Sequence, residues 1–357
     1  MCCYGLVEKN CTCEIKFTYL IIEDADRVAE IIKDHYLHSY SISTSIDIRK
    51  EQFTNAKIHS IYLYPIKSCA PMKVSRWPLD SSSLLYDRSF VIMQGRKPLT
   101  QKMLPMLCMI RPIIDLELRV MTISYPGEKD HVLNLKKGSS RNIERTFKKT
   151  CVGKVCGDEV EGLDCGQDVS NWLESVTGLS NLTLVQLTKR EQRKSVKSYK
   201  QTQDLRSFAN EAQFLILNLN SVRELDKMLS LGESNEDNGN SVASKIEWIT
   251  EQFRGNIVMS GNLASFEEEH WRCIRVRNEH SGCVARFNIQ NLCKRCSVLS
   301  VDQKNGELTQ EPLKTLSKME GRKFSFGVLA SLECDKDFDL NNSYISTHWQ
   351  LEISCHK

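Results

Sequence analysis

The residues with the clearest chemical potential are Cys293 and Cys296, which enclose a lysine and an arginine in the run CKRC. A cysteine thiolate is a nucleophile and a soft metal ligand, and cations close to the sulfur favour it over the thiol. A structural zinc site normally needs a second Cys-x-x-Cys pair or two histidines. The chain has no second pair, and Cys151 and Cys156 are five positions apart. The run therefore offers thiolate chemistry, with a shared zinc ion as the alternative and a packed thiol as the ordinary interpretation of Cys293.

Three further segments place a basic residue where a predicted element ends or begins. Lys67, in YPIKS, ends a predicted strand, Arg88 opens another, and Arg254, in FRGNIV, follows a predicted helix. A guanidinium donates two parallel hydrogen bonds to phosphate or carboxylate, so these residues are candidates for binding an anion. Each has an ordinary alternative. Lys67 and Arg88 are also explained as solvated strand-end charges, and Arg254 as a charge that neutralises the end of the preceding helix.

Several common catalytic motifs are absent from the sequence. It contains no G-x-G-x-x-G after a predicted strand, no P-loop, no H-E-x-x-H and no G-x-S-x-G. Any chemistry must then rest on cysteine and on basic residues. Residues 189–206 carry seven basic and two acidic residues without apolar periodicity, which predicts either a solvated loop or a basic loop that covers an anionic ligand.

The elements expected to position these residues are mainly short strands. IHSIYLYPI and SFVIMQG are β-rich runs bounded by Pro, Gly or Asp. Residues 114–120 alternate apolar and charged side chains, which predicts a half-buried antiparallel strand. Short strands at close spacing favour a small barrel or sandwich.

Helices are predicted between the strands. One opens at Asp168 and ends at Gly178, and capping boxes at Ser221-x-x-Glu224 and Ser244-x-x-Glu247 predict two more helix starts. Residues 14–37 predict a strand followed by a helix capped by Asp24.

Composition sets limits on the class of protein. The chain has 357 residues, and its 48 basic against 45 acidic residues argue against a dedicated nucleic-acid-binding protein. No apolar run is long enough for a membrane span, and the N-terminus lacks the layout of a signal peptide, so a cytoplasmic location is expected. The 15 cysteines are therefore expected to be reduced and mostly buried as small apolar residues.

In their order and spacing the pieces resemble the MOSC family, the C-terminal domains of molybdenum cofactor sulfurases and their relatives. The matching pieces are YPIKSC, YDRSFVIM, LTQKMLPMLCMIRP, GLDCGQDVSNWLESVTG, NEAQFLILNLNSVREL, FRGNIVMSGNLASFEEEHW, CKRCSVLSVDQKNGE and EPLKTL. The resemblance covers about residues 57–330. It implies a mainly β fold with helices, in which an N-terminal MOSC β-barrel precedes a MOSC domain with a β-barrel core and packed helices.

The resemblance also implies a division of the chain. Residues 1–40 resemble the end of an aminotransferase-fold cysteine-desulfurase domain, and residues 41–56 a linker. The N-terminal β-barrel domain is expected at 57–190, the MOSC domain at 191–330 and a C-terminal tail at 331–357. Most of the desulfurase domain, with its pyridoxal-phosphate lysine, has no counterpart here, so pyridoxal phosphate is not expected to bind this chain.

By resemblance, the site binds the molybdenum cofactor, a phosphorylated pterin dithiolene. Cys296 is the expected molybdenum ligand and catalytic residue, and the expected cofactor-binding residues are Lys67, Ser68, Arg88, Arg254, Arg295 and Cys296. One departure is Gly255, where the family commonly has proline, and this glycine is expected to loosen the aim of Arg254.

The resemblance implies an enzyme that replaces an oxo ligand on molybdenum by a sulfido ligand. A cysteine desulfurase supplies the sulfur, and xanthine dehydrogenase and aldehyde oxidase receive the activated cofactor. Two alternatives stay open. One is a MOSC-type oxidoreductase that reduces N-hydroxylated compounds with electrons from a cytochrome b5 partner, and the other is a non-catalytic module that stores the cofactor.

Overall fold

The structure is a computed structural model that describes residues 53–80, 83–135, 150–155, 158–187, 212–230, 242–279, 281–319, 324–333 and 343–356. The strand and helix expected at 14–37 and the basic segment at 189–206 lie outside these residues. In the described part, strands predominate and four α-helices accompany them. The expected mainly β fold with helices is thus confirmed.

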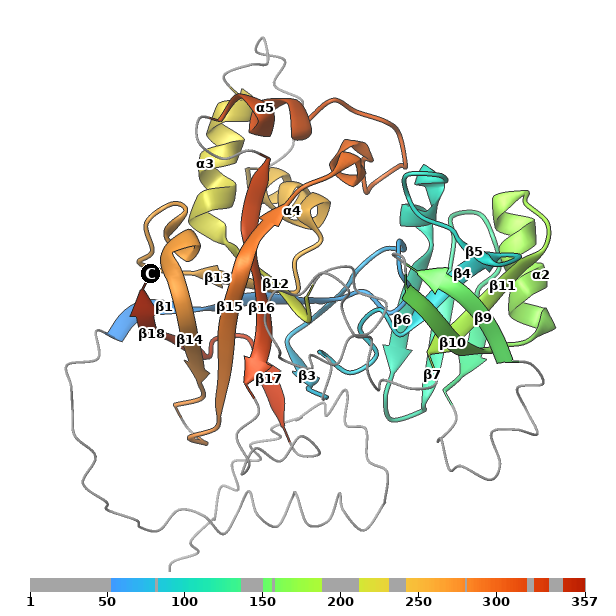
Figure 1. Cartoon of the computed structure of the whole chain (residues 1–357), viewed down its shortest axis with the longest axis horizontal. Coiled ribbons are helices and arrows are strands. Elements are labelled where there is room, and N and C mark those ends of the chain that lie inside the picture. The colour runs from blue at the N-terminus through green and yellow to red at the C-terminus, as the bar shows by residue number, and fades with distance from the viewer. Residues whose placement is uncertain are drawn as a thin grey trace, which may run out of the picture.

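The larger part of the molecule is a closed seven-stranded barrel (Figure 1). Around it run β13 (Ile257–Ser260), β12 (Phe214–Asn218), β16 (Ser325–Glu333), β15 (Val284–Lys294), β14 (Trp271–Arg277), β18 (Gln350–His356) and β1 (Phe53–Leu63). The barrel closes because β1 pairs with β13 as well as with β18. All neighbours are antiparallel except β12 and β13, which run parallel.

Three helices cover one side of this barrel (Figure 1). They are α3 (Leu219–Ser230), α4 (Val242–Phe253) and α5 (Leu313–Lys318). Their apolar faces form a buried cluster with barrel side chains, in which Val222 and Phe253 meet Leu217, Val258 and Phe326. The Phe253 and Phe326 rings are stacked with centroids 4.1 Å apart. This packing fixes the end of α4, after which Arg254 follows.

Strands from distant parts of the chain build the barrel, which differs from the expected division. β1 begins in the expected linker and ends in the range expected for the N-terminal domain, yet most of its pairing is with barrel strands from the second half of the chain. Residues 331–357, expected as a tail, contain the end of β16 and all of β18. β18 stays in the sheet because both of its edges are paired, one with β14 and the other with β1.

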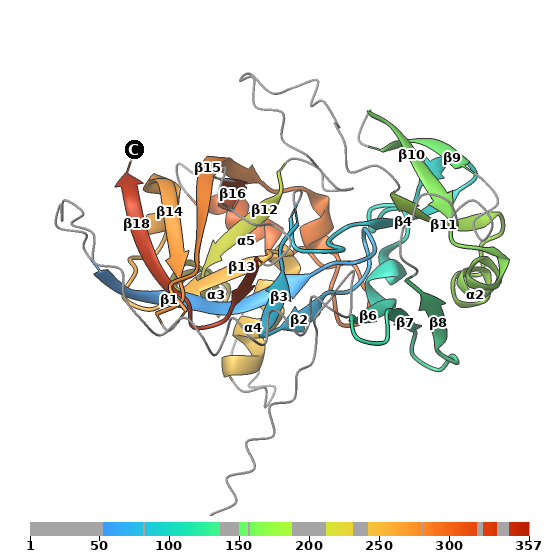
Figure 2. The same cartoon turned by 90° about the horizontal axis from the view of Figure 1, so that it is seen from below.

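A second, smaller half lies beside the barrel in both views (Figures 1 and 2). One sheet has the order β5 (Lys97–Pro98), β4 (Phe90–Gln94), β11 (Leu182–Leu187), β10 (Asp158–Asp164) and β9 (Thr150–Val155). It curls so that its edge strands β5 and β9 contact each other. A three-stranded sheet contains β6 (Arg111–Asp115), β7 (Val120–Ser124) and β8 (His131–Asn134). The helix α2 (Gln167–Thr177) packs on β11 and β8.

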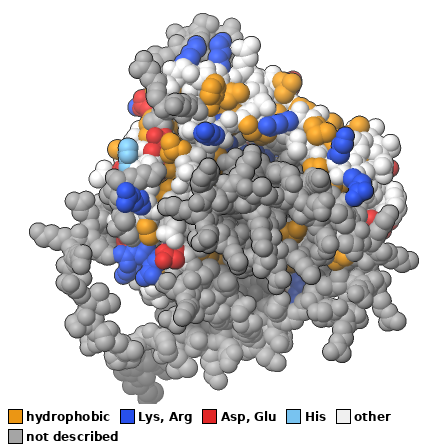
Figure 3. Space-filling model, viewed as in Figure 1, with side chains coloured by type: hydrophobic (Ala, Val, Ile, Leu, Met, Phe, Trp, Pro, Cys, Tyr) orange, Lys and Arg blue, Asp and Glu red, His pale blue; other side chains and the backbone are white. Residues whose placement is uncertain are grey.

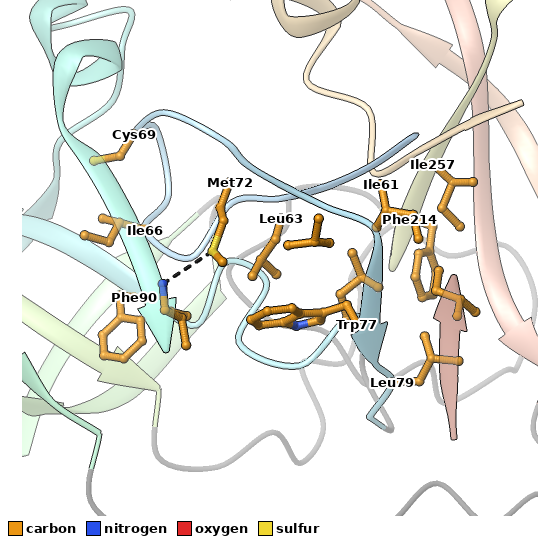
Figure 4. Close-up of a cluster of buried hydrophobic side chains, with 14 of the residues drawn as sticks. Ile61, Leu63, Ile66, Cys69, Met72, Trp77, Leu79, Phe90, Phe214 and Ile257 are labelled. Atoms are coloured by element: carbon orange, nitrogen blue, oxygen red, sulfur yellow. Dashed lines mark hydrogen bonds between the residues drawn. The ribbon is translucent and has the colours of Figure 1, made fainter. Parts of the chain in front are cut away.

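One continuous hydrophobic core joins the two halves. Figure 4 shows Phe214 and Ile257 of the barrel in the same buried cluster as Phe90 of the smaller half, with Trp77 between them. Trp77 lies on β3 (Arg76–Pro78), which pairs with β17 (Tyr344–Ser346). β2 (Met72–Val74) extends the barrel sheet beyond β1, and the dashed line in Figure 4 is a hydrogen bond from the Ile114 amide to the Met72 sulfur at 3.3 Å. The halves are therefore joined by shared side-chain packing.

Two local predictions are wrong in detail. Residues 114–120 do not form one strand: β6 ends at Asp115 and β7 begins at Val120, with a tight turn between them. Leu118 lies in that turn and is exposed, and Arg119 has a φ of 54°. Apolar and charged residues keep alternating through the turn, so the sequence pattern does not show where the hairpin turns.

The capping boxes also fail to mark helix starts. α3 begins at Leu219, so Ser221 lies inside its first turn, and α4 begins at Val242, two residues before Ser244. The end of α2 is confirmed: Gly178 adopts the left-handed conformation, with φ 69°, and its amide caps the Glu174 carbonyl.

The described surface mixes charged and apolar side chains. On the coloured part of the face in Figure 3, Lys and Arg side chains lie scattered among hydrophobic ones. This distribution agrees with the near balance of acidic and basic residues in the sequence. Within the described ranges, no helix is both long enough and apolar enough to cross a membrane.

Candidate functional site

The chain that leaves β1 runs alongside the start of β4, and this pairing brings two of the expected site residues together. The Lys67 amide donates to the Phe90 carbonyl at 2.8 Å, and the Arg88 amide donates to the Tyr64 carbonyl at 2.7 Å. Ile66 and Phe90 form a parallel bridge between the two segments. Lys67 is buried, with 9% of its surface exposed, so it is not the fully solvated strand-end charge of the ordinary interpretation.

Three of the six expected site residues have left-handed backbones. The φ angles are 71° at Ser68, 48° at Arg88 and 55° at Arg254. Such angles are uncommon in residues other than glycine and persist where the surrounding structure enforces them. Strained residues of this kind concentrate at binding and catalytic sites, so the observation supports a functional role for these segments.

Arg88 is held by groups of the protein itself. Its guanidinium forms an ion pair with Asp87, whose other oxygen accepts the Tyr64 amide at 2.8 Å. Nη1 also donates to the side-chain oxygen of Asn256 at 3.0 Å, and Nη2 donates to the backbone carbonyl of Arg254 at 3.2 Å. Asp87 is buried, so its charge needs this partner. Arg88 therefore ties the smaller half of the molecule to the backbone that carries Arg254.

Arg254 lies over the ring of Tyr64, with its Cζ 4.4 Å from the ring centroid, while Arg88 lies 4.7 Å from the same centroid. Its Nη1 donates to the Gln303 side-chain oxygen at 3.2 Å. Neither Nε nor Nη2 donates a hydrogen bond to any residue that the structure describes. Burial lowers the pKa of Arg254, but an arginine stays protonated at neutral pH. The site thus contains a guanidinium cation whose Nε and Nη2 make no hydrogen bond to the described residues.

The backbone around Gly255 is fixed and not loosened, contrary to the expectation. The Gly255 carbonyl accepts the Tyr64 hydroxyl at 3.3 Å, and the Asn256 amide donates to the Leu215 carbonyl at 2.8 Å. A Cβ at position 255 would lie 2.7 Å from the Leu217 side chain. Glycine is therefore suited to this position by close packing against β12, and Arg254 keeps a defined direction.

The two cysteines of the CKRC run have different surroundings. Cys293 is buried near the end of β15, whereas Cys296 is exposed and directly precedes the short 3-10 helix Ser297–Ser300. The Arg295 guanidinium donates to the sulfur of Cys293 at 2.9 Å and to the Phe253 carbonyl at 2.7 Å. Arg295 thus contacts Cys293 and anchors the run beside Arg254.

Two further cysteines face Arg254 from the smaller half. Cys69 and Cys108 are both buried, and the charge of Arg254 acts on both thiols. Burial raises the pKa of Cys108 to about 11 and raises that of Cys69 further. Both therefore remain thiols at neutral pH, and Cys108 donates weakly to the Asp302 carbonyl at 3.5 Å.

The zinc alternative finds no ligand set in the described part of the chain. No group of three His, Cys, Asp or Glu side chains there could hold a metal ion. Cys156 and the side chain of Cys151 lie outside the described residues.

Four residues of the site were not expected as site residues from the sequence: Tyr64, Asn256, Gln101 and Gln303. Tyr64 supports both guanidinium groups, and Asn256 accepts from Arg88. Gln101 and Gln303 are 1% and 5% exposed, which is unusual for glutamine. The local pattern around them carries no signal of burial, because the contact joins segments 202 positions apart.

Comparison with known proteins identifies the family. Residues 55–180 match the MOSC N-terminal beta barrel domain, and residues 203–340 match the MOSC domain. The chain belongs to the MOSC family. The site described above lies where the two MOSC units meet, because Arg88 comes from the first match and Arg254 from the second.

Curated relatives agree with this assignment. The chain is 35% identical over 288 residues to the molybdenum cofactor sulfurase of Bos taurus, a match that covers 79% of this chain and 30% of that protein. It is 33% identical to molybdenum cofactor sulfurase 3 of Aedes aegypti, covering 87% and 39%, and 34% identical to the Homo sapiens protein, covering 76% and 29%. The MOSC chain described here therefore spans about a third of the length of these relatives.

Proposed function

We propose that this chain binds the molybdenum cofactor as its substrate and supports the replacement of an oxo ligand on molybdenum by a sulfido ligand. The named relatives support the proposal, because they are molybdenum cofactor sulfurases matched at 33–35% identity. The match covers only about a third of their length. The activity proposed for this chain is therefore argued from the residues of its own site.

The observation that carries the proposal is the unused hydrogen-bonding capacity of Arg254. Its Nε and Nη2 have no hydrogen-bond acceptor among the described residues, while Nη1 is fixed on Gln303. This edge of a guanidinium matches two oxygens of a phosphate group. A phosphorylated pterin would thus be held by Arg254, with the ammonium of Lys67 and the hydroxyl of Ser68 as further donors from the neighbouring segment.

Arg88 and Arg295 have supporting roles in this proposal. Because Arg88 is paired with Asp87 and bonds the Arg254 backbone, its main effect on the ligand passes through Arg254. Arg295 bonds the Phe253 carbonyl, next to Arg254, and fixes the run that ends in Cys296. Cys296 is exposed and offers a soft sulfur ligand of the kind that molybdenum accepts.

The sulfur donor and the recipients are part of the same proposal. A cysteine desulfurase would supply sulfur as a persulfide, from which a thiol reductant would release sulfide by forming a disulfide. The sulfide would replace the oxo ligand, which leaves as water, and xanthine dehydrogenase and aldehyde oxidase would receive the activated cofactor. The exposed position of Cys296 leaves that residue accessible to other proteins.

The test compares two arginine variants produced in cells that make the cofactor. Arg254→Ala should lose most of the pterin and molybdenum that co-purify with the chain, because removing a paired guanidinium from a bound anion costs about 2–5 kcal/mol. The control is Arg223→Ala, which removes an exposed guanidinium on α3 that bonds Asn220. The pterin content is measured by fluorescence after oxidation, and the molybdenum content by elemental analysis. Equal retention by the two variants, or none by the unaltered chain, would contradict the proposal.

A further inference from the structure

We propose that Gln303, held in turn by Gln101, is a positioning residue that orients Arg254 so that its Nε–Nη2 edge receives a phosphate group. This inference rests on the proposed function for the identity of the ligand, but the orientation of Arg254 can be measured without it. Gln303 lies in the turn that follows the 3-10 helix after Cys296, and Gln101 in the turn after β5. The pair therefore connects both MOSC units to one guanidinium.

The two glutamines form a reciprocal amide pair. Gln101 Nε2 donates to Gln303 Oε1 at 3.0 Å, and Gln303 Nε2 donates to Gln101 Oε1 at 3.2 Å. Both side chains are buried, and a buried amide is stable only where its donors and acceptors are bonded. The pair thus behaves as one rigid unit against which Arg254 rests.

The direction of the Gln303 amide is determined by its neighbours. Arg254 Nη1 can only donate, so at 3.2 Å it must face the amide oxygen of Gln303. The Val301 carbonyl can only accept, and it lies 3.0 Å from Gln303 Nε2. If the amide were flipped, its Nε2 would face the Arg254 donor and its Oε1 would face the Val301 carbonyl, and neither contact could be a hydrogen bond. Arg254 therefore meets a fixed acceptor at Nη1, while its Nε and Nη2 make no hydrogen bond to the described residues.

The backbone of Gln303 is held as firmly as its side chain. Its amide donates to the side-chain oxygen of Gln252, a residue of α4 with 0% exposure, at 3.1 Å. Gln252 Nε2 donates to the Leu299 carbonyl at 3.4 Å. Because α4 ends one residue before Arg254, the same helix sets the position of both partners. A change at Gln303 should therefore alter the freedom of Arg254 without displacing its backbone.

The experiment measures rotation of the Arg254 guanidinium by NMR in the full chain, with the signal assigned by Arg254→Lys. Gln303→Met keeps the length of the side chain and removes the acceptor. Gln213→Met is the matched control, since Gln213 is also buried but bonds the Leu332 amide, at 2.7 Å, in the barrel. Inorganic phosphate, titrated against the Arg254 Nε–H signal, serves as the ligand probe.

We expect Gln303→Met to speed rotation of the guanidinium by about tenfold or more and to weaken phosphate binding by about ten- to a hundred-fold, the effect of losing one hydrogen bond to a charged group. Gln101→Met leaves the acceptor of Gln303 in place but removes the side chain that holds it. Its rotation rate and phosphate affinity should therefore lie between those of Gln303→Met and the unaltered chain. Rotation and phosphate affinity equal to those of the control would overturn the inference. Loss of co-purified pterin is scored separately, so failure of the proposed function is distinguished from failure of this inference.

Discussion

At the scale of single residues, the site depends on what each charged group is bonded to. Arg88, Arg254 and Arg295 look alike in the sequence, yet Arg88 and Arg295 each bond protein groups through both terminal nitrogens, whereas Arg254 does so only through Nη1 among the described residues. Arg88 carries a buried ion pair and Arg295 bonds Cys293 and Phe253. Sequence reasoning finds such residues by type and spacing but cannot assign their partners, because the partners come from distant segments.

The two cysteines of the CKRC run provide a prediction at this scale. Cys296→Ala should lose molybdenum while it keeps pterin, because the thiolate is the proposed metal ligand and the phosphate contacts remain. Cys293→Ala should keep molybdenum and lose about 1–2 kcal/mol of stability, since it removes a small buried side chain that also accepts from Arg295. Elemental analysis and thermal melting of both variants provide the comparison. Equal metal loss from the two would instead indicate a metal shared by both cysteines.

At the scale of elements, long-range contacts override local signals. The Ser221 hydroxyl, expected to cap a helix, donates to Glu268 at 2.9 Å and accepts the Phe266 amide at 2.7 Å. The end of α2 at Gly178 was predictable because the capping signal there is local to the chain. The hairpin at 115–120 was not, because a period of two does not show where one strand ends and the next begins.

Glu268 makes the link between α3 and the 3-10 helix Glu267–His270 sensitive to pH. It is fully buried, and burial raises its pKa to about 7 despite hydrogen bonds from Ser221 and Asn218. In the unfolded chain this pKa returns to its ordinary value of 4.5. Between those values the folded state binds more protons, so stability falls as pH rises, by at most about 1.4 kcal/mol per pH unit.

Glu268→Gln should remove this dependence, since an amide does not ionise. Urea unfolding midpoints measured between pH 5 and pH 8 should fall less steeply for the variant than for the unaltered chain. Parallel pH profiles would show that the Glu268 carboxylate ionises without cost in the folded protein.

At the scale of the whole molecule, closure of the barrel joins parts of the chain that the sequence separates widely. The order of the MOSC pieces and the mainly β character were predictable, because they depend on motifs and on local periodicity. The pairing of β1 with β13 and of β18 with β14 was not, since strand order depends on contacts between residues far apart in the sequence, such as Lys57 with Ser260 and Trp271 with His356. The domain boundaries expected at residues 57 and 331 fall inside β1 and β16, two strands of the same barrel.

Gly261, directly after β13, tests how tightly this closure is built. Its φ is 123°, and a Cβ there would lie 2.1 Å from the Asn55 carbonyl oxygen and 2.6 Å from the Ala56 Cα, both on β1. Backbone atoms cannot yield as a flexible side chain can, so Gly261→Ala should force β1 and β13 apart and cost about 3 kcal/mol or more. The control is Gly282→Ala. Gly282 has a φ of 69°, and a Cβ there would have no non-neighbouring atom within 4 Å. Only the left-handed backbone is then unfavourable for alanine, by about 1–2 kcal/mol. Chemical unfolding of both variants measures the difference. Equal losses of unfolding free energy in the two variants would mean that β1 can move away from β13 at little cost.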